Sequence, residues 1–187
     1  SEQKADYRAG ACVALNGQYA IVSQLAYVEN RESVAFVFAV ATGTELLKLQ
    51  PTDRANMEAF GYQIAVDGHI AIIGDSEAGS GDRGAAHLFD LRTGQELHKL
   101  IANDAQTESD FGYTVEIQGN LAVVGAAWQD GTGAVYLFDV TTGQQLAKIR
   151  HADARNGDHS HALSLEGNIL AIGSGQYYSG GNGAVYL

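Results

Sequence analysis

The feature that most constrains the fold is a unit of four short strands, clearest between residues 111 and 149. Residues 114–118 alternate polar and apolar side chains, which is the two-residue period of a half-buried strand. Residues 121–124 form a continuous apolar run, which suits a strand that is covered on both faces. Two further strands, at 134–138 and 145–149, complete an antiparallel meander. A single meander cannot bury both of its faces, so it requires neighbours.

The neighbours lie in the same chain, because the unit recurs. Its first turn contains a glycine at positions 17, 68, 119 and 167, which are separated by 51, 51 and 48 residues. A period near 50 residues with four strands per unit is typical of β-propeller blades. We therefore predict an all-β fold, a β-propeller of four-stranded antiparallel blades in a single domain, residues 1–187. The four repeats cover about residues 9–50, 60–101, 111–150 and 159–187, and the last blade lacks its outer strand.

Three short motifs carry a resemblance to a known family. The first motif, Phe-Gly-Tyr, occurs at residues 60–62 and 111–113. The second is an apolar run that ends in glycine, at residues 70–74 and 121–125. The third is Gly-Ala-Val-Tyr-Leu-Phe at residues 133–138. Together these motifs resemble FG-GAP repeats, the blades of integrin-alpha-type β-propellers. The first and fourth repeats depart from the motif, with Ala9-Gly10 and His159-Ser160 in place of Phe-Gly. The resemblance implies a propeller with a binding or adhesion function, in an extracellular or cell-surface protein.

In many FG-GAP blades an acidic loop between the first two strands binds calcium. Such a cation takes roughly six to eight oxygen ligands. Here the four corresponding turns contain one carboxylate at most, as in Asp67-Gly68 and Glu166-Gly167. We therefore expect no metal ion and no cofactor. A zinc site that includes His159 and His161 is the alternative, and polar replacement of a degenerate Phe-Gly pair explains both histidines without a metal.

Charge and hydropathy exclude two classes of partner. The formal net charge of −11 disfavours nucleic acid, which requires a basic surface, and permits cations or basic partners. The longest apolar runs are far shorter than the roughly 18 residues of a membrane span, so we expect no membrane insertion. Cys12 is the only cysteine and cannot form an internal disulfide.

The loops at one end of the blades contain the candidate binding residues. In an antiparallel blade, the connection between the second and third strands lies on the same face as the link to the next blade. Aromatic and acidic side chains gather there, and such a rim suits a glycan or a protein ligand. The alternative is that the aromatic rings pack over loops while the acids keep the surface soluble. The candidates are Tyr27, Asp104, Asp110, Trp128, Asp130, Tyr177 and Tyr178.

We predict a non-enzymatic binding or adhesion module, because the innermost strands offer mostly Ala, Val, Ile, Leu and Tyr side chains. No catalytic residues are singled out, and no Gly-x-Ser-x-Gly motif is present. Two other functions stay open. One is a carbohydrate-active or metal-dependent enzyme with its site at the propeller axis. The other is a purely structural role in a larger propeller assembly.

The last strand predicts self-association. Ala184, Val185, Tyr186 and Leu187 would form a sheet edge with unpaired amide and carbonyl groups. Such an edge pairs readily with another chain, so we predict a homodimer through these four residues or through the ends of the blade array. A closed four-bladed monomer is the alternative.

Overall fold

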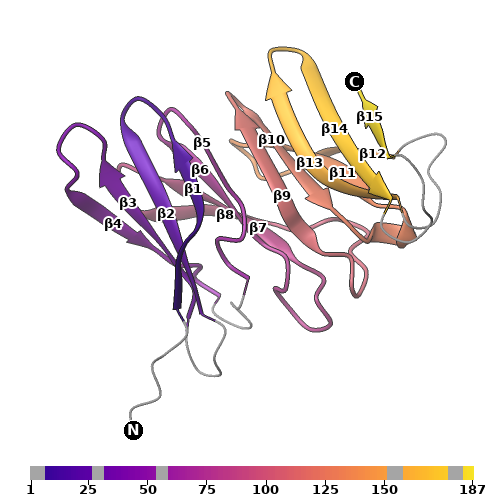
Figure 1. The fold of residues 1–187 in the computed structure, drawn as a ribbon, viewed down its shortest axis with the longest axis horizontal. Coiled ribbons are helices and arrows are strands. Elements are labelled where there is room, and N and C mark those ends of the chain that lie inside the picture. The colour runs from indigo at the N-terminus through magenta and orange to yellow at the C-terminus, as the bar shows by residue number, and fades with distance from the viewer. Residues whose placement is uncertain (1–6, 27–31, 54–58, 151–157, 177–182) are drawn as a thin grey trace, which may run out of the picture.

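The computed structural model describes residues 7–26, 32–53, 59–150, 158–176 and 183–187. They form four antiparallel sheets, each with its strands in sequence order, and the sheets lie side by side in chain order (Figure 1). We number these sheets as blades 1 to 4. The strands are β1 (Tyr7–Leu15), β2 (Tyr19–Ala26), β3 (Val34–Ala39) and β4 (Glu45–Leu49) in blade 1; β5 (Ile64–Asp67), β6 (Ile70–Asp75), β7 (Ala85–Asp90) and β8 (Gln95–Leu100) in blade 2; β9 (Phe111–Gln118), β10 (Leu121–Ala126), β11 (Ala134–Asp139) and β12 (Gln145–Ile149) in blade 3; and β13 (Asp158–Glu166), β14 (Ile169–Gln176) and β15 (Ala184–Tyr186) in blade 4.

The predicted fold class is confirmed. Every blade is a meander, and blade 4 has three strands among the described residues. The strand positions follow the hydrophobic pattern, because the alternating run of β9 pairs with the continuous apolar run of β10. The extent of the domain, residues 1–187, stays a prediction. No helix of the described residues is long and apolar enough to cross a membrane.

Three apolar clusters hold the blades together. Phe60 and Phe89 lie in the cluster between blades 1 and 2, and Phe111 and Phe138 lie in the cluster between blades 2 and 3. A smaller cluster around Ile172 joins blades 3 and 4. Neighbouring blades therefore bury the apolar faces that they turn toward each other.

The Phe-Gly pairs of the repeats perform two tasks at each joint. Phe111 is fully buried, and its ring meets those of Tyr136 and Phe138 at centroid distances of 5.4 and 5.8 Å. Gly112 has a φ of 96°, and a Cβ there would lie 2.1 Å from the carbonyl oxygen of Ala85 in the preceding blade. Only glycine allows this close approach of two backbones.

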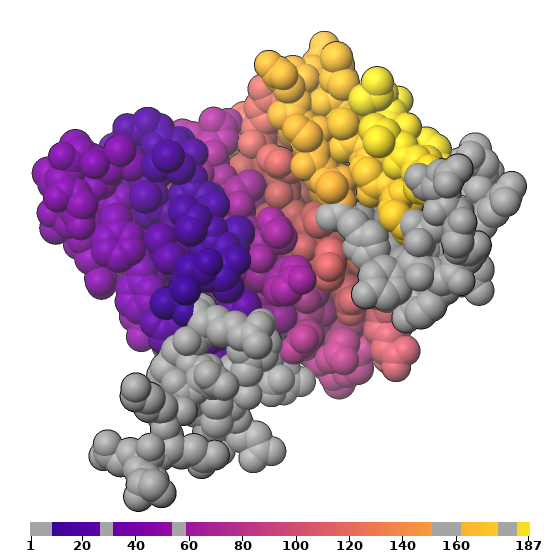
Figure 2. Space-filling model, viewed as in Figure 1, coloured from indigo at the N-terminus to yellow at the C-terminus, as the bar shows by residue number. Residues whose placement is uncertain are grey.

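The described blades form an open array. The innermost strands contact one another in order, β1 with β5, β5 with β9 and β9 with β13. Within the described residues, β13 makes no comparable contact with β1. Figure 2 shows the same arrangement, with the indigo surface of blade 1 and the yellow surface of blade 4 at opposite ends of the molecule.

Candidate ligand-binding site

Three loops meet at the junction of blades 2 and 3. They are the β6–β7 loop, the segment from β8 to β9, and the β10–β11 loop, which contains a short 3₁₀ turn, η1 (Gln129–Gly131). The amide of Glu108 donates to the carbonyl of Gly81 at 2.7 Å, and the hydroxyl of Ser109 donates to the carbonyl of Arg83 at 2.9 Å. The amide of Trp128 donates to the carbonyl of Ser109 at 3.2 Å. These bonds fix the three loops relative to one another.

The backbone of these loops holds acidic residues in an uncommon conformation. Among the described residues, the non-glycine residues with positive φ are Asp82, Glu108, Asp110 and Asp130, at 50° to 58°. All four belong to the three loops. A left-handed conformation costs a non-glycine residue on the order of 1 kcal/mol, although aspartate tolerates it better than most. Such residues cluster at functional sites, where surrounding contacts hold them in place.

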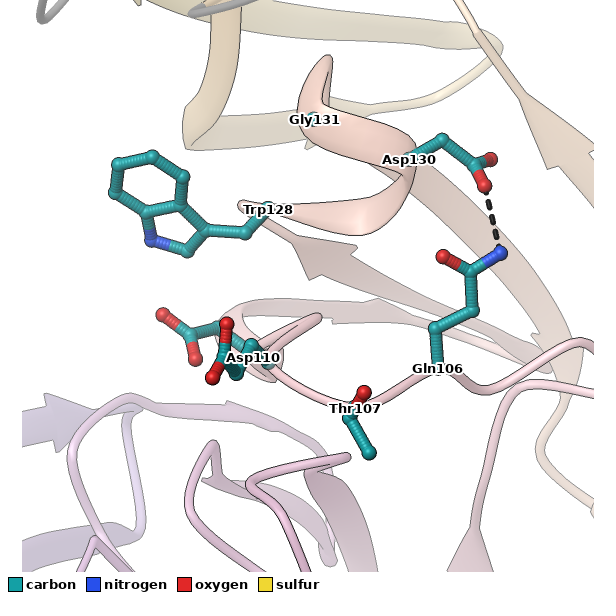
Figure 3. Close-up of a pocket in the computed structure, with 7 residues that line it drawn as sticks. Gln106, Thr107, Asp110, Trp128, Asp130 and Gly131 are labelled. Atoms are coloured by element: carbon teal, nitrogen blue, oxygen red, sulfur yellow. Dashed lines mark hydrogen bonds between the residues drawn. The ribbon is translucent and has the colours of Figure 1, made fainter.

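Two of these loops, the segment from β8 to β9 and the β10–β11 loop, line an open pocket of about 510 Å³. Figure 3 shows Trp128 and Asp110 on one side of it, with Asp130 and Gln106 on the other. The amide nitrogen of Gln106 donates to Asp130 Oδ1 at 2.7 Å and so closes the second side. The lining residues are Gln106, Thr107, Glu108, Asp110, Trp128, Asp130 and Gly131.

The Trp128 side of the pocket is strongly anionic. Burial, together with the negative charges of Asp82, Glu77 and Glu108, raises the pKa of Asp110 to about 6. A hydrogen bond from the Trp128 side chain acts in the opposite direction. Ionised Asp110 therefore sits among like charges, and a positive group placed beside it would be stabilised by all of them.

The Asp130 side is neutralised by basic residues. Lys148 Nζ lies 2.5 Å from Asp104 Oδ2 and 3.2 Å from Asp130 Oδ2, and Arg150 lies 3.2 Å from Asp130. Burial raises the pKa of both aspartates, but hydrogen bonds outweigh it and leave each pKa below its ordinary value. Lys148 donates to both carboxylates, and Tyr136 donates to Asp104 at 2.9 Å. The two sides of the pocket therefore differ in charge.

The structure brings three of the predicted binding residues together, namely Asp110, Trp128 and Asp130. Asp104 does not line this pocket and instead pairs with Lys148. Tyr27, Tyr177 and Tyr178 lie outside the described residues. The prediction did not include four lining residues, Gln106, Thr107, Glu108 and Gly131. Glu108 shares a linking segment with Asp110, two residues away, and this spacing was the available signal.

A metal site is not formed by the described side chains. Among them, no group of three or more His, Cys, Asp or Glu residues is placed to hold a metal ion. The side chains of His159 and His161 lie outside the described part of the chain, so the alternative zinc site is untested. The absence of a metal and of a cofactor stays a prediction.

The fold and this pocket define a β-propeller with its candidate site in the loops between two blades. The model of the FG-GAP repeat matches residues 44–89 and 95–138. The FG-GAP resemblance that the motifs predicted is therefore confirmed over these two stretches. No curated protein matches the sequence significantly.

Solved structures with the same fold include two enzymes. Kuenenia stuttgartiensis hydrazine synthase superimposes with a TM-score of 0.69 at 15% identity, over 99% of this chain and 47% of that chain. A europium-containing methanol dehydrogenase superimposes with a TM-score of 0.52 at 13% identity, over 77% of this chain and 26% of that one. The chain thus spans about half the length of hydrazine synthase and about a quarter of the dehydrogenase.

These similarities correct one expectation. The prediction that the chain is not an enzyme rested on the apolar side chains of the innermost strands, and it was wrong. Propellers of this kind occur in chains of hydrazine synthase and methanol dehydrogenase, which are enzymes. Apolar inner strands therefore do not separate binding modules from enzymes, because a site can be built from the loops instead.

Proposed function

We propose that the chain is an extracellular binding and adhesion module whose pocket between blades 2 and 3 takes a basic side chain of a protein ligand. The observation that supports this most is the placement of Trp128 beside Asp110 in an open pocket, with the charges of Asp82, Glu77 and Glu108 close to Asp110. The FG-GAP repeats support the extracellular and adhesive role.

Charge favours a basic group over a neutral sugar. Burial and the neighbouring acids disfavour the ionised form of Asp110 and raise its pKa to about 6. A lysine or arginine side chain would offset both effects, whereas sugar hydroxyls carry no charge to offset them. The indole of Trp128 adds a flat aromatic face, and cations bind such a face with about 0.5–2 kcal/mol. The net charge of −11 would also steer a basic partner toward this surface.

The test uses the fluorescence of Trp128, which is the only tryptophan in the chain. We expect saturable spectral changes on titration with tetralysine or tetraarginine peptides at pH 7.5, and none with tetraglycine. Affinity should fall with added salt, and it should fall again below pH 6 as Asp110 becomes protonated.

Asp110→Asn should weaken peptide binding about tenfold, which corresponds to roughly 1.4 kcal/mol. Glu166→Gln is the matched control, because it removes one carboxylate from a hairpin of blade 4 and should leave affinity unchanged. If neutral oligosaccharides bound saturably and the basic peptides did not bind, the proposed protein ligand would be wrong and a glycan would be the ligand.

A second function is favoured by the same carboxyl group. An acid with a pKa near 6 in a pocket that contains other carboxylates can act as a general acid in glycoside hydrolysis. We therefore also propose to assay chromogenic glycosides between pH 5 and 7. Hydrolysis that Asp110→Asn removes would favour the enzyme. Hydrolysis unaffected by this substitution, or absent, would count against it.

A further inference from the structure

Blades 1 and 2 are tied together by two polar contacts at their outer strands. Glu96 on β8 accepts a hydrogen bond from the amide of Thr52 at 2.7 Å and another from its hydroxyl at 2.6 Å. Lys99, three residues further on, donates to the carboxylate of Asp53 at 2.8 Å. Thr52 and Asp53 are adjacent residues of the segment that leaves blade 1. We call this pair of contacts the inter-blade latch.

The same latch joins blades 2 and 3. Gln145 on β12 accepts a hydrogen bond from the amide of Asn103 at 2.9 Å. Lys148, again three residues on, donates to Asp104 at 2.5 Å. Asn103 and Asp104 are adjacent in the segment that leaves blade 2. The latch is therefore a repeated device, in which an outer strand provides an acceptor and a lysine, and the preceding blade provides an amide and a carboxylate.

Blade 1 contains the outer-strand half of this latch, and none of the described residues meets it. Glu45 pairs with Phe38 and Lys48 pairs with Phe36 in the β3–β4 ladder. Glu96 and Lys99 have the same register on β7, and Gln145 and Lys148 have it on β11. Within the described residues, the side chains of Glu45 and Lys48 make no hydrogen bond and no ion pair.

The rear face of blade 1, which points away from blade 2, is apolar and open. Val13 is 59% exposed and Leu15 is 66% exposed. On blade 3 the corresponding face packs against blade 2, and all of its members are at most 7% exposed. Position for position, Val13, Leu15, Val22, Phe36 and Phe38 of blade 1 correspond to Val115, Ile117, Val124, Tyr136 and Phe138 of blade 3.

A third, independent observation, at the start of blade 1, also indicates a neighbour on this side. Gly61 and Gly112 have positive φ, and a Cβ on either would clash with the preceding blade, at Ser23 or at Ala85. Gly10 occupies the same place in blade 1 with a φ of 79°, yet nothing lies within 4 Å of a Cβ placed there. The joint is shaped for a neighbour on this side as well.

We propose that the rear face of blade 1 is a docking surface for a further FG-GAP blade, and that Glu45 and Lys48 latch the segment leaving that blade. The chemistry of the occupant follows from the two filled latches. It presents an apolar sheet face, and after its outer strand it offers an amide to Glu45 and, on the next residue, a carboxylate to Lys48. A second copy of this chain is a weaker candidate, because in both described latches the amide and carboxylate already bind within the chain.

An extended chain tests the proposal. A copy of residues 60–110, which is blade 2 with its leaving segment, is fused directly before Ala9 in place of residues 1–8. This fusion preserves the repeat register and offers Asn103 and Asp104 of the copy to Glu45 and Lys48. Leu15→Asp should then lower the melting temperature by about 5 °C or more in the extended chain and by less than about 2 °C in the original chain. Lys48→Ala should also lower the melting temperature more in the extended chain than in the original chain, but by a smaller amount than Leu15→Asp.

Leu146→Asp is the matched control, because Leu146 is 60% exposed on an outer strand and should respond alike in both chains. Equal effects of Leu15→Asp in the two chains would overturn the proposal. A second extended chain, with a copy of residues 9–59 as the added blade, guards against a poor junction, and failure of both chains to fold would also count against the proposal. Sedimentation of the original chain completes the test, since a dimer that Leu15→Asp dissociates would show that the occupant is a second copy.

Discussion

The joint between blades 1 and 2 and the joint between blades 2 and 3 share one backbone arrangement, but they differ in their buried polar groups. At the first joint His87 is 1% exposed and its Nδ1 donates to Glu96 at 2.6 Å, while its Nε2 has no partner. At the second joint the same position holds Tyr136, whose hydroxyl donates to Asp104. The repeat therefore fixes where a polar group is buried and leaves open whether the group is satisfied.

The difference extends to a second residue. Asp75 is 2% exposed on blade 2, and one of its carboxylate oxygens has no hydrogen-bond partner. A buried polar atom without a partner costs roughly 1–3 kcal/mol. Gln129 Oε1, in the β10–β11 loop beside the segment that leaves blade 2, is also buried without a partner. Blade 2 carries two such atoms, on His87 and Asp75, so we expect the joint between blades 1 and 2 to open before the joint between blades 2 and 3.

The strongest way to break this comparison is at the paired glycines. Gly112→Ala would place a Cβ 2.1 Å from a backbone oxygen, whereas Gly61→Ala would place one 2.7 Å from the Cβ of Ser23. A side chain yields more easily than a backbone, so Gly112→Ala should lose 4 kcal/mol or more, or roughly the whole stability of a marginal domain. Gly61→Ala should lose less in urea denaturation. The reverse order would mean that the joint between blades 1 and 2 is the tighter one.

A smaller effect is expected from Asp75. Burial raises its pKa from 3.8 to about 7, and the native state therefore binds a proton that the unfolded state has lost between these values. Stability from this group is fully present below about pH 4 and declines as the pH rises through 7. The decline amounts to roughly 4 kcal/mol at 1.36 kcal/mol per pH unit. Asp75→Asn should flatten the pH dependence of the free energy of unfolding over this range, and an unchanged profile would contradict the assignment.

The comparison can also be sharpened by exchange of residues. In the double substitution His87→Phe and Glu96→Gln, each new residue is the one found at the equivalent position of another blade. Phe36 of blade 1 corresponds to position 87, and Gln145 of blade 3 corresponds to position 96. The double substitution removes the unpartnered nitrogen and keeps an acceptor for Thr52, so we expect a gain of about 1 kcal/mol in thermal denaturation at pH 7. At acid pH the gain should be larger, because the pKa of Glu96, lowered to about 2, makes its contribution fall as the pH drops from about 4.5 toward 2. His87→Phe alone should be less stable than the double variant, because it leaves the Glu96 carboxylate without its buried partner.

The smallest effect on stability is expected for a substitution on β15, at the blade 4 end of the array. Val185 is exposed on β15, and the homodimer predicted through residues 184–187 stays a prediction. Light scattering should give a mass of two chains at micromolar concentration, and Val185→Lys should reduce it to one chain without altering the melting temperature by more than about 2 °C. A mass of one chain for the unaltered protein would contradict the dimer.

The sequence predicted those features of the fold that depend on the local pattern of residues, namely the strands, the turns and the blades. The turn glycines and the alternating strands placed the blades, and the order of strands in a blade placed Trp128 and Asp110 on one rim. Contacts between blades were beyond prediction, because they depend on how one sheet is registered against the next. Asp104 was expected to face a ligand and pairs with Lys148, which is 44 residues away. The expectation of a non-enzymatic protein also failed, because apolar inner strands, on which it rested, do not separate propellers of enzymes from binding modules.

The matches to the FG-GAP repeat begin in the outer strand of one blade and end in the third strand of the next, since residues 44–89 run from β4 to β7 and residues 95–138 from β8 to β11. Each sheet is therefore shared by two consecutive units of sequence. To pull two units apart along the array, a force must shear the hydrogen-bond ladder between β7 and β8, not merely peel one apolar face from another. An array built in this way therefore resists a pulling force with the backbone hydrogen bonds inside each sheet, in addition to the apolar contacts between sheets.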